Sequence, residues 1–212
     1  MVRGMTSPCR FKKVTKADLS FFPASRSISV SKTTMNDGDK QRRLMELLAP
    51  LHDGARMTAR RLCRSHADGD DLFHEAVLRA IDHVGELREP EKFRSWFYAV
   101  LLNVHRARHR LSFWRRLVPL EDSRAELVVS DESDALAGAQ RMARALATLA
   151  PQEREALVLF ELEGFSLEEL AALQQSSLSA VKSRLVRARG RLRRHYERRE
   201  RVTRPLVQEQ QS

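Results

Sequence analysis

The chain has 212 residues, with 38 Lys and Arg against 28 Asp and Glu, which gives a formal net charge of +10. This balance excludes an acidic solvating protein and favours a polyanionic partner, while 42% hydrophobic residues suffice for one domain or two small ones. No stretch approaches the about 18–20 uninterrupted apolar residues of a membrane span. Cys9 and Cys63 are too few for a disulfide scaffold or a four-ligand zinc site. We therefore expect a cytoplasmic protein without membrane insertion.

The basic charge is concentrated at the amino terminus. Residues 1–34 hold seven bases and one acid, are rich in Ser and Thr, and show no sustained helical periodicity. Residues 1–39 are therefore predicted to be a disordered arm or a targeting peptide. Alternatively, translation starts at Met35 and the residues before it are not part of the protein. The sequence does not decide between Met1 and Met35 as the start.

From residue 40 onward the hydrophobic pattern is helical. Leucines at 44, 47, 48 and 51 define one helix face, and further helices are expected over 55–64, 70–84 and 91–111. Ser65 to Gly69 is predicted to be a polar turn. Trp96 and Phe97 lie on the periodic stripe of the last helix and are assigned to the core. Together these helices form a first compact domain, residues 40–112.

A charged connector and a second helical block follow. Residues 121–134 hold six acids and one base, so residues 113–138 are predicted to be a flexible acidic linker. Helices are expected over 139–149 and, after Pro151, over 152–163. Ser166 and Glu169 fit a capping box at the start of a short helix that ends at Leu173. The fold class is therefore all-α, with two small domains.

The second domain contains the pattern of a helix-turn-helix. A short helix, Leu167 to Leu173, precedes a polar turn and a long basic helix that begins at Leu178. Spacing places one apolar stripe of the long helix inward (Val181, Leu185, Ala188, Leu192). The opposite arc carries polar and basic groups suited to DNA (Lys182, Ser183, Val186, Arg187, Arg193, Arg194). The alternatives are a solvated basic helix or the end of a coiled coil.

Residues 146–192 closely resemble the carboxy-terminal domain of extracytoplasmic-function (group IV) sigma factors of bacterial RNA polymerase. Motifs of the first block resemble that family's amino-terminal domain, in the right order (Asp70-Asp71-Leu72-Phe73-His74-Glu75, Leu78-Arg79-Ala80, Phe93-Arg94-Ser95-Trp96-Phe97-Tyr98, Asn103). The resemblance assigns 40–112 to a region 2-like domain, 139–200 to a region 4-like domain and 201–212 to a tail.

The resemblance also implies a function and its residues. The chain would bind core RNA polymerase, recognise promoter DNA and promote transcription initiation, under control of an anti-sigma factor. Core polymerase would be bound by one helix (Asp70, Asp71, Leu72, Glu75, Arg79). The minus-ten element would be bound by the loop 83–92 and the next helix (Asn103, Arg106, Arg108, His109, Arg110), and the minus-thirty-five element by the recognition helix (Lys182, Ser183, Arg184, Arg187). The alternative is a stand-alone helix-turn-helix regulator that binds duplex DNA without polymerase.

One departure from the family lies in the turn, where Gln175 replaces a common Gly, so a left-handed backbone there would be less favourable. Other chemistry is weakly supported. His105 and His109 have a zinc-compatible spacing, but Arg106 stands where a metalloprotease has Glu, so we expect no metal. The glutamate pair Glu161 and Glu163 is interpreted as solvated charge. We expect no cofactor and no enzymatic activity.

Overall fold

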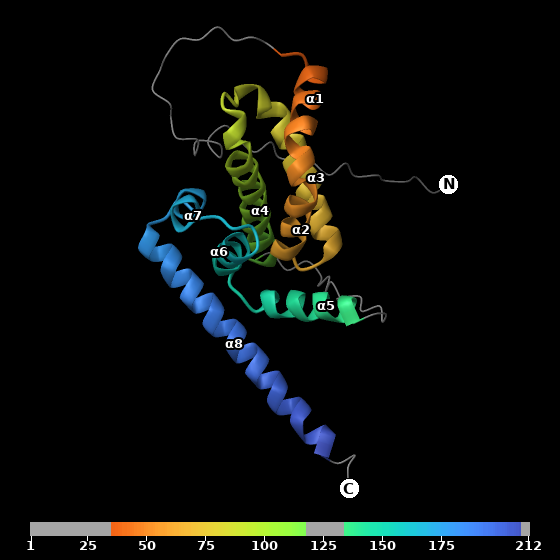
Figure 1. Cartoon of the computed structure of the whole chain (residues 1–212), viewed down its shortest axis with the longest axis vertical. Coiled ribbons are helices and arrows are strands. Elements are labelled where there is room, and N and C mark those ends of the chain that lie inside the picture. The colour runs from red at the N-terminus through yellow and green to blue at the C-terminus, as the bar shows by residue number, and fades with distance from the viewer. Residues whose placement is uncertain (1–34, 118–133, 209–212) are drawn as a thin grey trace, which may run out of the picture. The chain divides into compact units, whose positions relative to one another are not determined.

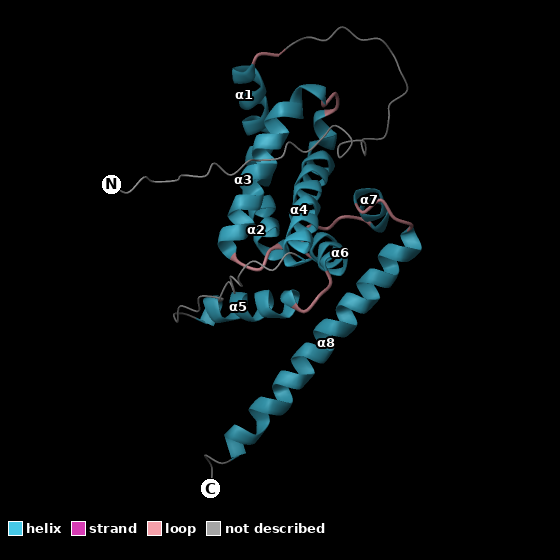
Figure 2. Cartoon of the chain, turned by 180° about the vertical axis from the view of Figure 1, so that it is seen from behind, coloured by secondary structure: helices cyan, strands magenta, loops and turns pink. Residues whose placement is uncertain are grey.

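The computed structural model describes residues 35–117 and 134–208, with side chains over 35–110 and 138–199. The amino-terminal extension up to residue 34 and most of the acidic linker lie outside the described residues. The described parts of both helical blocks belong to one compact unit that starts at Met35. In the part of the chain described, every regular element is a helix, as predicted (Figures 1 and 2).

The first block consists of four α-helices and three short 3₁₀ turns. In chain order they are α1 (Asp37–Leu48), η2 (Ala49–Leu51), α2 (His52–Leu62), α3 (His66–His83), η3 (Val84–Glu86), η4 (Pro90–Lys92) and α4 (Phe93–Leu117). The 3₁₀ turn at η2 contains Pro50, where the sequence predicts an interruption. Helix α3 lies against α1, α2 and α4, so it forms the centre of the block.

The second block consists of α5 (Asp134–Ala147), α6 (Pro151–Glu161), α7 (Leu167–Leu173) and α8 (Leu178–Gln208). Helix α8 packs against α5, α6 and α7 along its amino-terminal half and then extends past them (Figure 1). It continues helical through the segment that was predicted to begin a tail at residue 201. Among the described helices, none is both long and apolar enough to span a membrane.

The predicted turn at Ser65 to Gly69 is wrong, because most of it forms the first turn of α3. Ser65 is the N-cap, and its hydroxyl accepts a hydrogen bond from the Asp68 amide at 3.0 Å. Gly69 is buried where α3 crosses α2: a Cβ placed there would lie 2.4 Å from the Cα of Arg60. The glycine therefore permits close helix packing and does not mark a turn.

Aromatic side chains fill the core of the first block, as the periodicity predicts. Trp96 and Phe97 are buried, and Phe97 stacks on Phe93 with ring centroids 5.8 Å apart. Phe73 meets Phe97 edge to face at 6.2 Å. Cys63 is half-buried beside this core, and burial raises the pKa of its thiol to about 11, which disfavours the reactive thiolate.

The second block confirms the predicted inward stripe of the long helix. Val181, Leu185 and Ala188 are buried against α6 and α7. Helix α7 begins with the expected capping box: the Glu169 amide donates to the Ser166 hydroxyl at 3.1 Å, and the Ser166 amide donates to the Glu169 carboxylate at 2.8 Å. This capping box fixes where α7, the first helix of the helix-turn-helix, begins.

Candidate nucleic-acid interface

The turn between α7 and α8 is held in a left-handed conformation. Gln175 has φ of 50°, the only positive φ of a non-glycine residue in the described part of the chain. Its amide donates to the Ala172 carbonyl at 3.1 Å, and the Ser176 amide donates to the Ala171 carbonyl at 2.9 Å. The Ser177 hydroxyl then accepts from the Ala180 amide and caps α8. The turn thus adopts the geometry that normally favours glycine.

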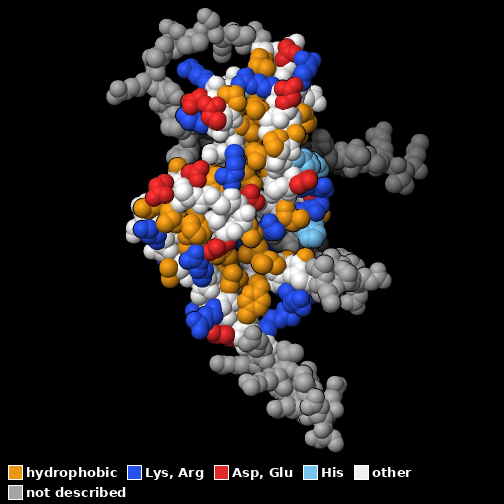
Figure 3. Space-filling model, viewed as in Figure 1, with side chains coloured by type: hydrophobic (Ala, Val, Ile, Leu, Met, Phe, Trp, Pro, Cys, Tyr) orange, Lys and Arg blue, Asp and Glu red, His pale blue; other side chains and the backbone are white. Residues whose placement is uncertain are grey.

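The first turns of α8 present an exposed, mixed polar and apolar surface. Lys182, Ser183, Val186 and Arg187 are all exposed on the side opposite the buried stripe. They line an open hollow of about 730 Å³ with Leu178 and Ser179. In Figure 3, hydrophobic and basic side chains lie side by side at the left of the view, where Figure 1 places this end of α8. Such a face combines groups for phosphates, base edges and apolar contacts.

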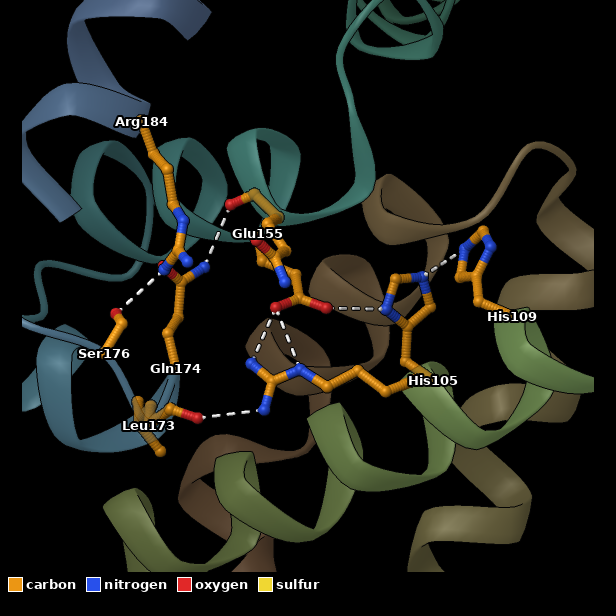
Figure 4. A network of polar contacts seen from close by, with 9 residues as sticks. His105, His109, Glu155, Leu173, Gln174, Ser176 and Arg184 are labelled. Carbon is orange, nitrogen blue, oxygen red and sulfur yellow. Dashed lines mark hydrogen bonds and ion pairs between the residues drawn. The ribbon is translucent and has the colours of Figure 1, made fainter. Parts of the chain in front are cut away.

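Arg184, also expected at this face, is engaged by the turn. Its guanidinium donates to the side-chain oxygens of Gln174 and Ser176, both at 2.8 Å (Figure 4). Gln174 in turn donates to the Gln152 carbonyl of α6 at 2.9 Å. Arg184 therefore ties the recognition helix to the turn.

Basic residues farther along α8 are paired with α6. Arg187 contacts the Glu153 carboxylate at 3.2 Å, and Arg191 contacts it at 3.3 Å. The Arg187 side chain remains more than half exposed, so its pairing with Glu153 is compatible with a reorientation towards phosphate.

The residues predicted to bind polymerase lie on α3 and differ in their exposure to solvent. Asp71 is exposed, and Glu75 and Arg79 are half-buried. Leu72 is completely buried and belongs to the core, so in this conformation it cannot contact a partner. Leu78, which the sequence reasoning did not select, is 64% exposed on the same side as Asp71 and Glu75, because these positions are spaced i, i+4 and i+7.

Asp70, at the start of this face, is held from within the chain. Its carboxylate receives hydrogen bonds from Arg60 at 2.7 and 2.9 Å and from Arg56 at 2.8 Å. These hydrogen bonds hold the pKa of Asp70 well below its usual range. The carboxylate therefore stays ionised and fastens α2 to α3.

The residues predicted to bind the minus-ten element also differ in exposure and in their contacts within the chain. Arg108 donates to the Glu75 carboxylate and to the Asp71 carbonyl, both at 2.9 Å, and so fastens α4 to α3. His109 and Arg110 are exposed near the described end of α4, and Asn103 is half-buried.

Arg106 belongs to a polar network that links α4 to α6 and α7, and Figure 4 labels its partners Glu155 and Leu173 together with His105. Its guanidinium contacts the Glu155 carboxylate of α6 at 2.7 Å and donates to the Leu173 carbonyl at the end of α7 at 3.1 Å. The other Glu155 oxygen lies 3.1 Å from Nδ1 of His105. Glu155 is 1% exposed and His105 is 2% exposed.

This network keeps the Glu155 carboxylate ionised. Burial pushes the pKa of Glu155 upward, but hydrogen bonding to His105 and the charge of Arg106 outweigh burial and bring that pKa below its ordinary value. A carboxylate only accepts, so Nδ1 of His105 carries the proton that it donates. Nε2 of His105 lies 3.1 Å from Nε2 of His109, so the network extends to the second histidine.

A second polar contact joins the two blocks around Glu163. Its carboxylate accepts from the hydroxyls of Thr58 and Tyr98, and its carbonyl accepts from Arg94. Burial, followed by hydrogen bonding to Glu163, raises the pKa of Tyr98. Glu163 is therefore not the solvated charge that the sequence suggested. Glu155 and Glu163 were missed because glutamates on a surface-like helix pattern give no sequence signal of a partner in another domain.

The fold and these surfaces define a class: an all-helical DNA-binding protein in which a helix-turn-helix block accompanies a second helical block. Comparison with known families narrows the class. Residues 48–115 match the family described as "Sigma-70 region 2", and residues 139–192 match "Sigma-70, region 4".

Individual relatives agree. The chain is 32% identical over 144 residues to the ECF RNA polymerase sigma factor SigM of Mycobacterium tuberculosis, an alignment that covers 68% of this chain and 70% of the relative. It is 30% identical over 169 residues to the RNA polymerase sigma-E factor of Streptomyces avermitilis, covering 78% and 91%. The chain therefore belongs to the extracytoplasmic-function sigma factors of RNA polymerase.

Solved structures show the same fold. RpoE of Bartonella quintana, solved with the anti-sigma factor NepR, superposes with a TM-score of 0.57 at 24% identity, covering 75% of this chain and 97% of RpoE. CnrH, solved with the cytosolic domain of CnrY, gives a TM-score of 0.54 at 25% identity, covering 76% and 94%.

Proposed function

We propose that this sigma factor divides its work between the two blocks: the first binds core polymerase and the minus-ten element, and the second reads the minus-thirty-five element. The observation that carries this proposal is the exposed basic and polar face of α8, presented by a helix-turn-helix whose residues match region 4. An exposed recognition helix with its opposite stripe buried can enter a major groove without unfolding its own domain.

Polymerase binding is assigned to α3. Its exposed side combines Asp71 and Leu78 with half-buried Glu75 and Arg79, so that charges surround an apolar centre. Asp70 supports this face through its bonds to Arg56 and Arg60. A central hydrophobic contact within a charged rim is the usual anatomy of a specific protein interface.

Minus-thirty-five recognition is assigned chiefly to Lys182, Ser183 and Arg187. A lysine and an arginine can neutralise phosphates or bond guanine, and a serine can bond either base type. Arg184 contributes by holding the turn, since the side chains of Gln174 and Ser176 that accept its hydrogen bonds lie in the turn itself.

Minus-ten binding is assigned to Asn103, Arg106, His109 and Arg110, with the loop 83–92, while Arg108 holds α4 in place. Arg106 is not available to DNA in this conformation, because its guanidinium is bound to Glu155 and to the Leu173 carbonyl. Contact with a DNA strand requires Arg106 to exchange those partners. We therefore propose that the contact between α4 and α6 opens when promoter DNA is engaged.

The direct test is run-off transcription from genomic fragments with purified core polymerase, with and without the chain. A promoter-dependent transcript and a complex with core polymerase are expected. The absence of both under all conditions would refute the proposal. A complex with DNA but none with core would support the alternative, a stand-alone regulator, which the sigma-factor relatives do not favour.

The division of labour is tested by the double substitution Lys182→Ala, Arg187→Ala. Loss of two cationic contacts should weaken promoter binding at least tenfold in low salt and reduce its salt dependence, with core binding retained. Equal loss of both activities would contradict the assignment. Asp71→Ala, Leu78→Ala is the matched variant, for which core binding is lost and the isolated fold is kept.

We propose further that the chain acts in the cytoplasm, catalyses no reaction of its own and is held inactive by an anti-sigma protein. Support for the last point comes from RpoE of Bartonella quintana, which has the same fold and was solved in complex with the anti-sigma factor NepR. Addition of such a protein should abolish the run-off transcript without affecting transcription by core polymerase carrying another sigma factor.

A further inference from the structure

Val186 is an exposed hydrophobic residue that the packing of its own domain does not require. Its side chain is 68% exposed, more than any other large hydrophobic residue among those the structure describes. The apolar stripe that holds α8 in place is already supplied by Val181, Leu185 and Ala188, all of which are buried. Val186 therefore contributes little to the packing of its own domain.

The position of Val186 relates it to the DNA-facing residues. It follows Lys182 by one helical turn and immediately precedes Arg187, and it lines the same open hollow as Ser183. Valine has no hydrogen-bonding group and a stiff χ1, so it offers a small, fixed apolar surface in the midst of polar neighbours.

The major groove presents one prominent apolar group, the C5 methyl of thymine. We propose that Val186 contacts a thymine methyl in the minus-thirty-five element and thereby selects thymine at one position of that element. This inference rests on the proposed function, because it requires that α8 lie in the major groove. Lys182 and Arg187 supply affinity around the contact, while Val186 supplies a preference among bases.

The expected preference is modest. Burying one methyl group is worth about 0.8 kcal/mol, which corresponds to about a fourfold change in affinity. Replacement of Val186 by Ala should remove most of this discrimination. Because the residue is exposed on a helix, Val186→Ala should leave thermal stability within about 0.5 kcal/mol of the wild type.

The experiment uses the full chain with core polymerase and duplex DNA randomised over the minus-thirty-five region. Sequences selected by the wild type and by Val186→Ala are compared, and we expect one thymine preference to be lost in the variant. That thymine is then replaced by deoxyuridine, which lacks only the methyl group. The wild type should bind the deoxyuridine duplex about fourfold more weakly, and most of this difference should be lost in Val186→Ala.

Arg187→Ala is the matched control, since loss of a cation should weaken binding to both duplexes by the same factor. The inference is overturned if the wild type binds thymine and deoxyuridine duplexes equally at every selected thymine. It is also overturned if Val186→Ala loses core binding with base preference unchanged, which would place Val186 against polymerase. Failure to select any sequence, despite core binding, would instead refute the proposed role of α8 and the inference with it.

Discussion

Arg106, Arg108 and Arg184 each donate to at least two acceptors within the chain. All three were selected from the sequence as DNA contacts, because Arg at these positions fits phosphate and base recognition. A guanidinium has five donors in a rigid fork, so it can equally well satisfy carbonyls and carboxylates of its own chain. Residue type alone therefore cannot separate a fastening arginine from a DNA-binding one.

Gln175 stores a small amount of backbone strain. Replacement by Gly should raise the free energy of unfolding by about 0.5–1 kcal/mol, because a left-handed conformation costs a residue with a β-carbon more than it costs Gly. Thermal unfolding should show an increase of about 2 °C in Tm. Gln175→Ala, which keeps the β-carbon, should show no increase. A Tm for Gln175→Gly at or below that of the wild type would contradict this account.

His109 should make stability depend on pH. His109 is exposed as a residue, but neighbouring groups remove part of the hydration of its ring. This desolvation, followed by the charge of His105, lowers the pKa of His109 in the folded state, so the folded chain binds fewer protons here than the unfolded chain. The free energy of unfolding should therefore fall as the pH drops through about 6.5, the ordinary pKa of histidine. Urea unfolding between about pH 8 and pH 5.5 should show a smaller fall for His109→Gln than for the wild type. Equal falls would exclude His109 as a source of the dependence.

Helices were the elements that the sequence predicted best. Leu44 and Leu48 of α1, and Val181 and Leu185 of α8, are buried where the periodicity placed them. The start of α3 was misplaced because Ser65 and Gly69 occur in turns as readily as at an N-cap or a helix crossing. Local composition does not reveal that the backbone of Arg60 lies against Gly69.

The crossing of α2 and α3 gives a prediction at this scale. Gly69→Ala should lower the free energy of unfolding by about 2 kcal/mol or more, because the new Cβ would meet the Arg60 backbone at 2.4 Å and force the helices apart. Gly190→Ala in α8 is the control, since its Cβ would meet only the far end of Arg194 at 3.8 Å. That change should raise stability by about 0.5–1 kcal/mol. Similar effects of the two substitutions in chemical denaturation would refute the close-packing explanation.

At the scale of the whole molecule, the main feature absent from the sequence prediction is the polar contact between the two blocks. Glu155 is separated from His105 by 50 residues, and Glu163 from Thr58 by 105 residues. Both domains could be predicted because the motifs of each consist of residues close together in the sequence. A contact between domains depends on which faces meet, and neither Glu155 nor Arg106 carries that information.

Glu155→Gln tests the contribution of this contact. Removing the carboxylate charge leaves Arg106 without its ionic partner and weakens the acceptor of the His105 hydrogen bond, so the free energy of unfolding should fall by about 2 kcal/mol. Run-off transcription should be retained, since the proposed promoter complex does not use the bond between Arg106 and Glu155. Glu161→Gln breaks an exposed pair with Arg189 and should cost less than about 0.5 kcal/mol. Loss of transcription at a temperature where Glu155→Gln remains folded would contradict the proposed opening.

Helix α8 has 31 residues, which at 1.5 Å per residue makes a rod about 46 Å long. One turn of duplex DNA advances about 34–36 Å, and its groove curves around the axis while the helix stays straight. In the proposed promoter complex, therefore, only the first turns of α8 can follow the groove, and the remainder rises away from the duplex as a lever. A small change in how the first turns seat on the bases would be magnified at the far end of that lever.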